Sequence, residues 1–259
     1  MQTTLSAKPT ARLWRVPLLL IAGMLVAKII NVTSFYVADL VFPAVAALDP
    51  DDVYLYITVH HVAQLLITLG LMLMVTIRWP PVTFRTFGFT TNDWRFSLKW
   101  VLLFCLAWSV VQFGAGYVLV KDGLSADPGY PLTARNLGGI LAFQVLLSGT
   151  SEEIMFRGLI MTALIAGWRS VFSSRRALGW AAVIGATLVF MFDHINFSLS
   201  PLAVTHFNPL QQGTALIFGL FYGALFWKTQ SLVGPILAHG LLNGIITLSG
   251  TLLFLLFRT

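Results

Sequence analysis

Seven long apolar stretches, separated by short polar segments, dominate the sequence and limit what this chain can fold into. Most of them reach the roughly 20 residues that an α-helix needs to cross a bilayer. They cover residues 14–33, 53–77, 100–120, 137–166, 178–197, 210–227 and 232–257. Because the last stretch can form one tilted helix or two short ones, the sequence predicts an all-α bundle of seven or eight transmembrane helices.

The overall composition supports this interpretation. Only 10% of the 259 residues are charged and 57% are hydrophobic, whereas a soluble domain carries about 25% charged residues. A soluble chain of this size cannot hide so much apolar surface from water, and a chain with so little charge is not expected to be disordered. We therefore expect a single integral membrane domain over residues 1–259, with the lipid bilayer as its surroundings.

The positive charges alternate from one connecting segment to the next. The N-terminal segment has three Lys or Arg residues, residues 78–99 have four and residues 167–177 have three. The intervening segment at 121–136 has two, and residues 198–209 have none. By the positive-inside rule, this pattern predicts a cytoplasmic N-terminus. Because the basic residues are scattered among apolar runs, we expect no nucleic-acid partner despite the net charge of +6.

Ionisable side chains are costly inside a bilayer, about 2.5–3.5 kcal/mol each on insertion scales, so each one requires an explanation. The third and sixth apolar stretches have no Asp, Glu, Lys, Arg or His, and those in the other stretches gather mainly in the fourth, fifth and seventh. They are Glu152, Glu153 and Arg157, then Asp193 and His194, then His239 with the amide Asn243. Outside this set, we expect Lys28 to snorkel or pair with a carboxylate, and His60 and His61 to lie at the membrane interface.

The fourth stretch places its charges on different helix faces. Residues four apart are neighbours on a helix, so Glu153 and Arg157 are predicted to pair. Glu152 lies about 100° around the helix from Glu153 and has no partner on its own helix. We therefore expect Glu152 to face a cavity, where it could act as a general base.

The other two polar stretches show the same four-residue spacing. Phe190 can brace His194, and His239 and Asn243 project from one face. Three helices that each have one polar face can shield these faces from lipid only by packing them together. The residue types alone leave three interpretations open: interhelical hydrogen bonding, ion or proton transport, and catalysis. The helix rise places Glu152 and His194 at similar depths in the membrane. His239 reaches that depth if the connection before it dips into the bundle, or if the fourth helix projects into the cytoplasm.

The spacing and order of these residues resemble a known family. Glu152-Glu153-x-x-x-Arg157, Phe190-x-x-x-His194 and His239-x-x-x-Asn243 occur in the order of the three motifs of the CPBP family, the CAAX protease and bacteriocin-processing family. This family includes the type II CAAX prenyl endopeptidases. The motif-bearing resemblance covers about residues 137–250.

The resemblance implies an intramembrane endopeptidase with about eight spans that acts on a membrane-associated or lipidated protein or peptide. It implies that Glu152 activates water with the aid of His194, and that His239 and Asn243 stabilise the oxyanion. Glu153, Arg157 and Phe190 would support this site. We expect the protein in the plasma membrane of a prokaryote. The alternative class is a transporter or a membrane scaffold without catalytic activity.

Metal dependence is a separate question. Members of the family have been described as metalloproteases, and Glu152, His194 and His239 could supply one carboxylate and two imidazole ligands to zinc. These ligands would come from three separate helices, which makes the set less preorganised. We therefore predict a metal-free glutamate mechanism without a cofactor. The single cysteine, Cys105, lies in an apolar run and is interpreted as a small buried hydrophobic residue.

Overall fold

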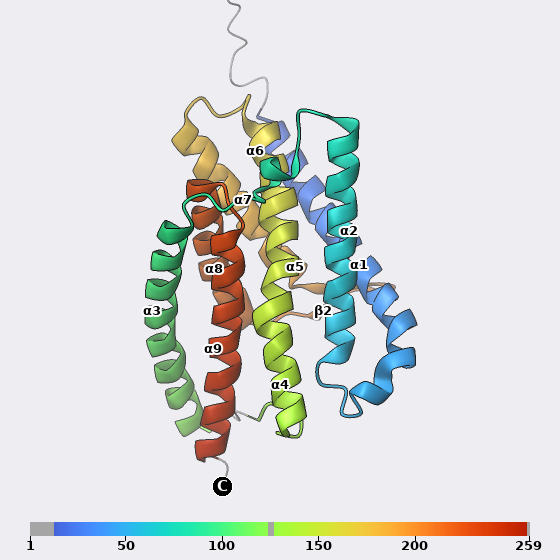
Figure 1. The fold of residues 1–259 in the computed structure, drawn as a ribbon, viewed down its shortest axis with the longest axis vertical. Helices are drawn as coiled ribbons and strands as arrows, with labels where there is room; N and C mark the ends of the chain where they lie inside the picture. The colour runs from blue at the N-terminus through green and yellow to red at the C-terminus, as the bar shows by residue number, and fades with distance from the viewer. Residues whose placement is uncertain (1–12, 124–126, 258–259) are drawn as a thin grey trace, which may run out of the picture.

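A computed structural model describes residues 13–123 and 127–257 of the chain as a bundle of long helices (Figure 1). The helices run in both directions along the bundle, as expected for consecutive apolar segments joined by short connections. Their bounds are α1 Arg15–Val45, α2 Leu55–Arg78, α3 Trp94–Lys121, α4 Ala134–Ala142, α5 Gly149–Glu153, α6 Thr162–Trp168, α7 Arg175–Asp193, α8 Pro209–Thr229 and α9 Val233–Phe257.

Helices α4, α5 and α6 form one continuous helical run, which contains the predicted stretch at 137–166. Wide π turns at Phe143–Ser148 and Ile154–Met161 separate its three α-helical parts. Such turns are rare and occur frequently at functional sites. Here they lie on both sides of α5, which carries Glu152 and Glu153.

Each of the seven predicted stretches lies largely within a long helical run, although α1 continues to Val45 and α7 ends at Asp193, before the predicted end at residue 197. Within the described residues, five helices are long and apolar enough to cross a membrane: Arg15–Leu48, Leu55–Arg78, Trp94–Lys121, Arg175–Asp193 and Val233–Phe257. These helices fit a multi-pass membrane protein. The predicted number of seven or eight spans is not confirmed, because α8 and the interrupted α4–α6 run are not among the five.

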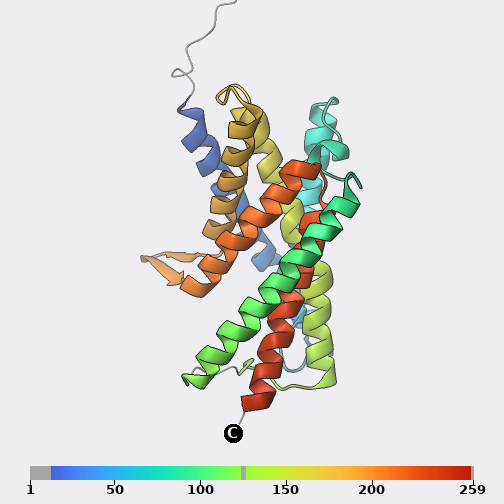
Figure 2. The same cartoon turned by 90° about the vertical axis from the view of Figure 1, so that its left-hand side faces the viewer.

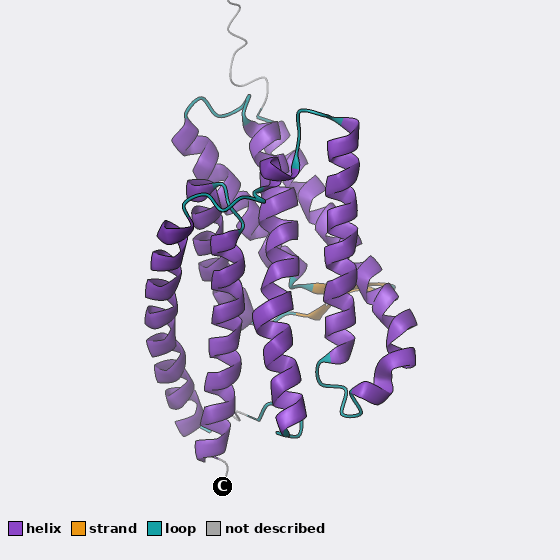
Figure 3. Cartoon of the chain, viewed as in Figure 1, coloured by secondary structure: helices purple, strands orange, loops and turns teal. Residues whose placement is uncertain are grey.

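The polar loop predicted at 198–209 is wrong in part, because most of it belongs to a hairpin. Strands β1 (Asn196–Leu199) and β2 (Leu202–His206) pair in antiparallel fashion. Phe197, Val204 and Thr205 are residues that favour strands, and Ser200 and Pro201 favour the turn between them. The hairpin projects from the side of the bundle, partway along its length (Figures 2 and 3).

The two ends of the bundle differ in charge. The first residues of α1 and α7 and the last residues of α2 and α6 lie at one end (Figure 1), where the chain has Arg15, Arg78, Arg169 and Arg175. The α1–α2 connection at the opposite end contains three aspartates, within residues 49–52. Lys8 and Arg12, which also entered the charge count, lie outside the described residues.

Apolar packing fixes the helices that surround the polar residues. The largest buried cluster joins α1 and α2 to the 154–168 segment, α7 and α8 through residues such as Met155, Trp168 and Phe190. A smaller cluster joins α3, α8 and α9 around Tyr222. Cys105 belongs to the smaller cluster and is buried, as predicted.

Candidate active site

One cavity of about 620 Å³ collects the polar residues that the sequence singled out. Glu152, His194, His239 and Asn243 all line it, and Phe190 lines it beside His194. The predicted convergence of three polar helix faces is therefore confirmed. Further lining residues come from α2, α3 and α8, so that six segments of the chain enclose the space.

Glu153 and Arg157 lie behind this cavity, as a buried pair. Nη1 of Arg157 is 2.8 Å from Oε1 of Glu153, and both side chains are fully buried. Nη2 of Arg157 donates to the carbonyl oxygen of Gly219 at 3.1 Å. The guanidinium also lies over the rings of Phe190 and Tyr222, 5.0 and 5.1 Å from their centroids. The predicted pair is confirmed, and it links the Glu152 helix to α7 and α8.

His239 bridges the two glutamates of the motif. Its Nδ1 lies 2.8 Å from Oε1 of Glu153, and its Nε2 lies 3.8 Å from Oε2 of Glu152. The backbones of α5 and α9 approach closely here, because a Cβ at Gly149 would come within 2.8 Å of the Gly240 nitrogen. Small residues permit such contacts between membrane helices, so this glycine pair allows His239 to reach both carboxylates.

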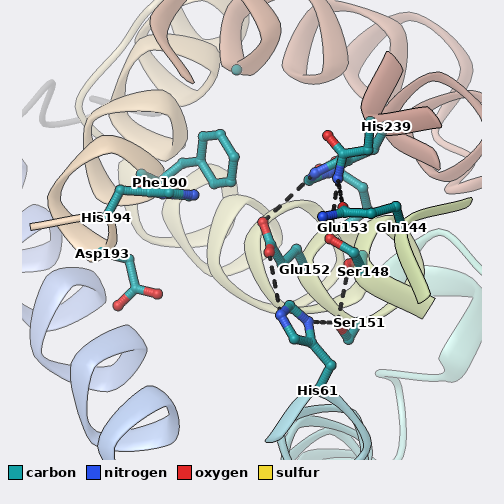
Figure 4. A network of polar contacts seen from close by, with 12 residues as sticks. His61, Gln144, Ser148, Ser151, Glu152, Glu153, Phe190, Asp193, His194 and His239 are labelled. Carbon is teal, nitrogen blue, oxygen red and sulfur yellow. Dashed lines mark hydrogen bonds and ion pairs between the residues drawn. The ribbon is translucent and has the colours of Figure 1, made fainter. Parts of the chain in front are cut away.

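Glu152 sits between two histidines, as Figure 4 shows. Its Oε1 is 3.8 Å from Nε2 of His61, and its Oε2 is 3.8 Å from Nε2 of His239. Both distances exceed hydrogen-bond length, and Oε2 is buried without a hydrogen-bond partner among the described residues. Glu152 is thus the carboxylate that remains available in the cavity, as predicted from its position on the helix.

His61 corrects the interpretation of the second apolar stretch. We expected His60 and His61 at the membrane interface, whereas the structure buries both and places His61 in the cavity wall. Nδ1 of His61 lies 2.7 Å from Oγ of Ser151. The missed signal was a polar stripe on one face of α2, because His61, Gln64 and Thr68 follow a helical spacing and all three are buried.

His194 approaches Glu152 from the opposite side of the cavity (Figure 4). It is the C-cap residue of α7 and not part of a helix that continues to residue 197. Its Nδ1 donates to the carbonyl oxygen of Phe190 at 2.8 Å, because a carbonyl oxygen can only accept. The two rings meet edge to face with centroids 4.6 Å apart. Nε2 of His194 is therefore the ring nitrogen that can accept a hydrogen bond in the cavity.

Asp193 points away from the cavity towards α1 (Figure 4). Nζ of Lys28 donates to its backbone oxygen at 2.7 Å and lies 3.6 Å from Oδ1. Asn31 donates to Oδ2 at 2.8 Å. Of the two expectations for Lys28, pairing with a carboxylate is therefore confirmed. These contacts attach the end of α7, and with it His194, to α1.

Asn243 belongs to a second polar group at the edge of the cavity. Its Nδ2 donates to Oε1 of Gln144 at 2.9 Å and to Oγ of Ser148 at 3.2 Å. Gln144, Ser148 and Ser151 were not among the predicted site residues. The spacing of Gln144, Ser148 and Glu152 at intervals of four could have revealed two of them, since these residues share one helix face.

The same residues can be compared with the requirements of a zinc site. His194 and His239 each donate from Nδ1 to an oxygen, an arrangement that leaves Nε2 as a potential ligand. However, no three His, Cys, Asp or Glu side chains of the described chain are placed so that they could hold one metal ion. The donor set with Glu152 does not fit zinc in this arrangement, and we derive no chemical step through a metal.

The fold and the site together define a membrane-embedded cavity with a carboxylate, imidazoles and an amide, the groups that peptide hydrolysis requires. A family model described as "Type II CAAX prenyl endopeptidase Rce1-like" matches residues 134–245. This match supports the resemblance to the CAAX protease-like CPBP family that the three motifs predicted. No curated protein and no solved structure matches the chain. The match begins at the first residue of α4 and leaves out α1, α2 and α3.

Proposed function

We propose that this protein is an intramembrane endopeptidase in which Glu152 activates the attacking water. One observation carries the proposal: Glu152 is the one carboxylate among the described residues that line the cavity, whereas Glu153 is neutralised behind it by Arg157. A general base must reach the water without being held by a strong ion pair. Glu152 satisfies this condition, and His194 stands on the other side of the same space.

The proposed reaction is a direct hydrolysis. Glu152 removes a proton from water while the water oxygen forms a bond to the carbonyl carbon of the substrate. The C–N bond then breaks, and the proton passes from Glu152 to the nitrogen of the leaving amine. His194 can accept a hydrogen bond from the same water through Nε2, since its Nδ1–H is already donated to Phe190.

The negative oxygen of the intermediate requires hydrogen-bond donors. His239 can supply one from Nε2 when its ring is protonated, because Glu153 on its Nδ1 side stabilises the positive charge. Asn243 can supply another, but the substrate must first displace its bond to Gln144 or to Ser148. Ser148 accepts from Asn243, so its own hydroxyl hydrogen remains available to the same oxygen.

The walls of the cavity suit a substrate with an apolar chain next to the cleaved bond. Trp108, Val111 and Leu119 of α3 and Phe218 of α8 line it together with the polar groups. We propose a membrane-associated protein as substrate, with a prenylated CAAX C-terminus as the first candidate because of the matched family. We also propose a cytoplasmic N-terminus, because the bundle end that contains Arg15, Arg78 and Arg169 is basic.

Native membranes allow a test that does not require a defined substrate. Cells lacking the protein are complemented with wild type or with Glu152→Gln, and the termini of their membrane proteins are profiled by mass spectrometry. Asp51→Asn serves as the control, since Asp51 lies in the α1–α2 connection, away from the cavity. We expect a set of new termini with wild type and Asp51→Asn that is absent with Glu152→Gln. Identical termini in all three strains would refute the proposal.

A further inference from the structure

We propose that His61 is a positioning residue for the base, which restrains one oxygen of Glu152 from 3.8 Å away while His239 restrains the other. This inference rests on the proposed function of Glu152. It assigns a role to α2, which lies outside the segment that matches the family model. The motifs in the sequence do not include His61.

The contacts of His61 with Ser151 are compatible with a ring that carries its proton on Nε2. Oγ of Ser151 lies 2.7 Å from Nδ1 of His61 and 3.0 Å from the carbonyl oxygen of Ser148, and its single hydrogen can be donated to either of them. A ring that restrains a carboxylate oxygen through Nε2 must carry its hydrogen there, so we assign Nδ1 as the acceptor of the Ser151 hydrogen across the 2.7 Å contact. In this arrangement His61 turns Nδ1 as an acceptor towards Ser151 and its Nε2–H towards Glu152.

His239 has the same arrangement on the other side of the carboxylate. Its Nδ1 is bound to Glu153, and its Nε2 faces Oε2 of Glu152 at the same 3.8 Å that separates His61 from Oε1. The terminal torsion of a glutamate is broad, so a carboxylate that is approached from one side only can rotate. Two imidazoles from different helices, each anchored at Nδ1, restrict Glu152 to one orientation in the cavity.

Loss of this restraint should reduce the rate of the chemical step. A misplacement of about 1 Å in a reacting group can cost about a hundredfold in rate. Binding should change little, because the apolar walls from α3 and α8 stay in place. We therefore expect substitutions that remove the Nε2 contact to lower kcat about 10- to 100-fold with little change in KM.

Two isosteric substitutions of His61 test the roles of its two ring nitrogens separately. In His61→Asn the amide nitrogen occupies about the position of Nδ1, so the bond to Ser151 can remain while the contact to Glu152 is lost. In His61→Gln the amide reaches about the position of Nε2. The proteins are purified in lipid nanodiscs and assayed with an internally quenched farnesylated peptide that ends in a CAAX sequence. We expect His61→Gln to retain a larger part of kcat than His61→Asn, and wild-type kcat in His61→Asn would overturn the inference.

His60 provides a matched control on the same helix. It is also buried, but it packs against Phe35, with ring centroids 3.9 Å apart, and does not line the cavity. His60→Asn should therefore keep kcat. Glu152→Gln is included to separate the two hypotheses. Full activity of Glu152→Gln would refute the assignment of Glu152 as the base. An inactive Glu152→Gln together with an unimpaired His61→Asn would refute only the proposed role of His61.

A measurement without turnover tests the same contact. The protein is labelled with ¹⁵N in its five histidines, and the ring nitrogens are observed by NMR in wild type and in Glu152→Gln. We expect His61 to carry its hydrogen on Nε2, and its Nε2 signal to shift on Glu152→Gln as the His239 signal does. The His60 signals should not move. An unchanged Nε2 signal of His61 would overturn the inference whether or not the peptide is cleaved.

Discussion

His239 donates from Nδ1 to Oε1 of Glu153, the same oxygen that pairs with Arg157. One buried carboxylate oxygen therefore connects α9 to the helical run that carries Glu152. The contact also orients the ring of His239, so that its Nε2 faces Glu152. The second glutamate of the motif thus has a structural explanation, since it positions a group of the cavity without entering the cavity itself.

The buried pair predicts a large loss of stability when its cation is removed. Arg157→Ala leaves Glu153 buried without its main partner, and breaking a buried pair in this way costs about 3–5 kcal/mol. We expect a lower unfolding temperature in detergent micelles, together with a lower yield of folded protein. Arg169→Ala is the control, because Arg169 is exposed. An unchanged unfolding temperature for Arg157→Ala would contradict the structural role of the pair.

The contacts between α1 and α7 predict an effect on activity from a residue far outside the matched segment. Lys28→Met removes both the hydrogen bond to the backbone of Asp193 and the ion pair with its side chain. Because His194 follows directly, we expect its ring to lose its fixed position and turnover to fall several-fold. Lys121→Met, at an exposed site, serves as the control. Equal turnover of Lys28→Met and wild type would show that α1 does not position His194.

The start of α2 predicts a pH dependence of stability. Burial alone would raise the pKa of Asp49, but the backbone N–H groups of residues 53–55 and the charge of Arg135 lower it below the ordinary value of 3.8. A carboxyl group whose pKa is lower in the folded state stabilises that state above the unfolded pKa, and the gain is lost as the pH falls through the folded pKa. We therefore expect Asp49→Asn to lower the unfolding temperature at neutral pH.

The same substitution should remove part of the pH dependence in acid. Unfolding temperatures measured in micelles between about pH 3 and pH 7 should fall less steeply for Asp49→Asn than for wild type. Asp122→Asn, which changes an exposed aspartate at the end of α3, is the control. Parallel curves for Asp49→Asn and wild type would show that the three N–H groups do not stabilise the ionised Asp49.

The choice of a metal-free mechanism predicts resistance to chelators. Glu152 acts as a base without an ion in our proposal, so activity towards the farnesylated peptide should survive dialysis against EDTA. Metal content is measured on the same sample by mass spectrometry. Activity that disappears on dialysis and returns with zinc would contradict the glutamate mechanism and would favour Glu152, His194 and His239 as ligands.

The sequence was sufficient to predict side-chain contacts that lie within a single helix. Glu153 and Arg157 pair, and Phe190 braces His194, because a spacing of four fixes these neighbours before any tertiary contact forms. The convergence of three helices was also predictable, since lipid provides no other surroundings for polar faces. The motifs also predicted the resemblance to the family whose model matches residues 134–245.

The remaining features depend on how the helices pack against one another. His61 joins the cavity only because α2 lies against α5, and an isolated pair of histidines near the start of an apolar stretch does not reveal this. Likewise, Lys28 contacts Asp193, which lies 165 residues later in the sequence. The hairpin was missed because its strands are four and five residues long, which is too short for a clear alternation of polar and apolar residues.

The most direct test of the account is the initial rate of peptide-bond cleavage by purified Glu152→Gln relative to wild type, in the same nanodiscs and with the same farnesylated peptide. Glutamine has nearly the same shape as glutamate but cannot remove a proton from water. We predict that the variant folds with an unfolding temperature close to that of wild type and cleaves at least about a hundredfold more slowly. A folded Glu152→Gln that cleaves at the wild-type rate would contradict the central claim that this carboxylate activates water.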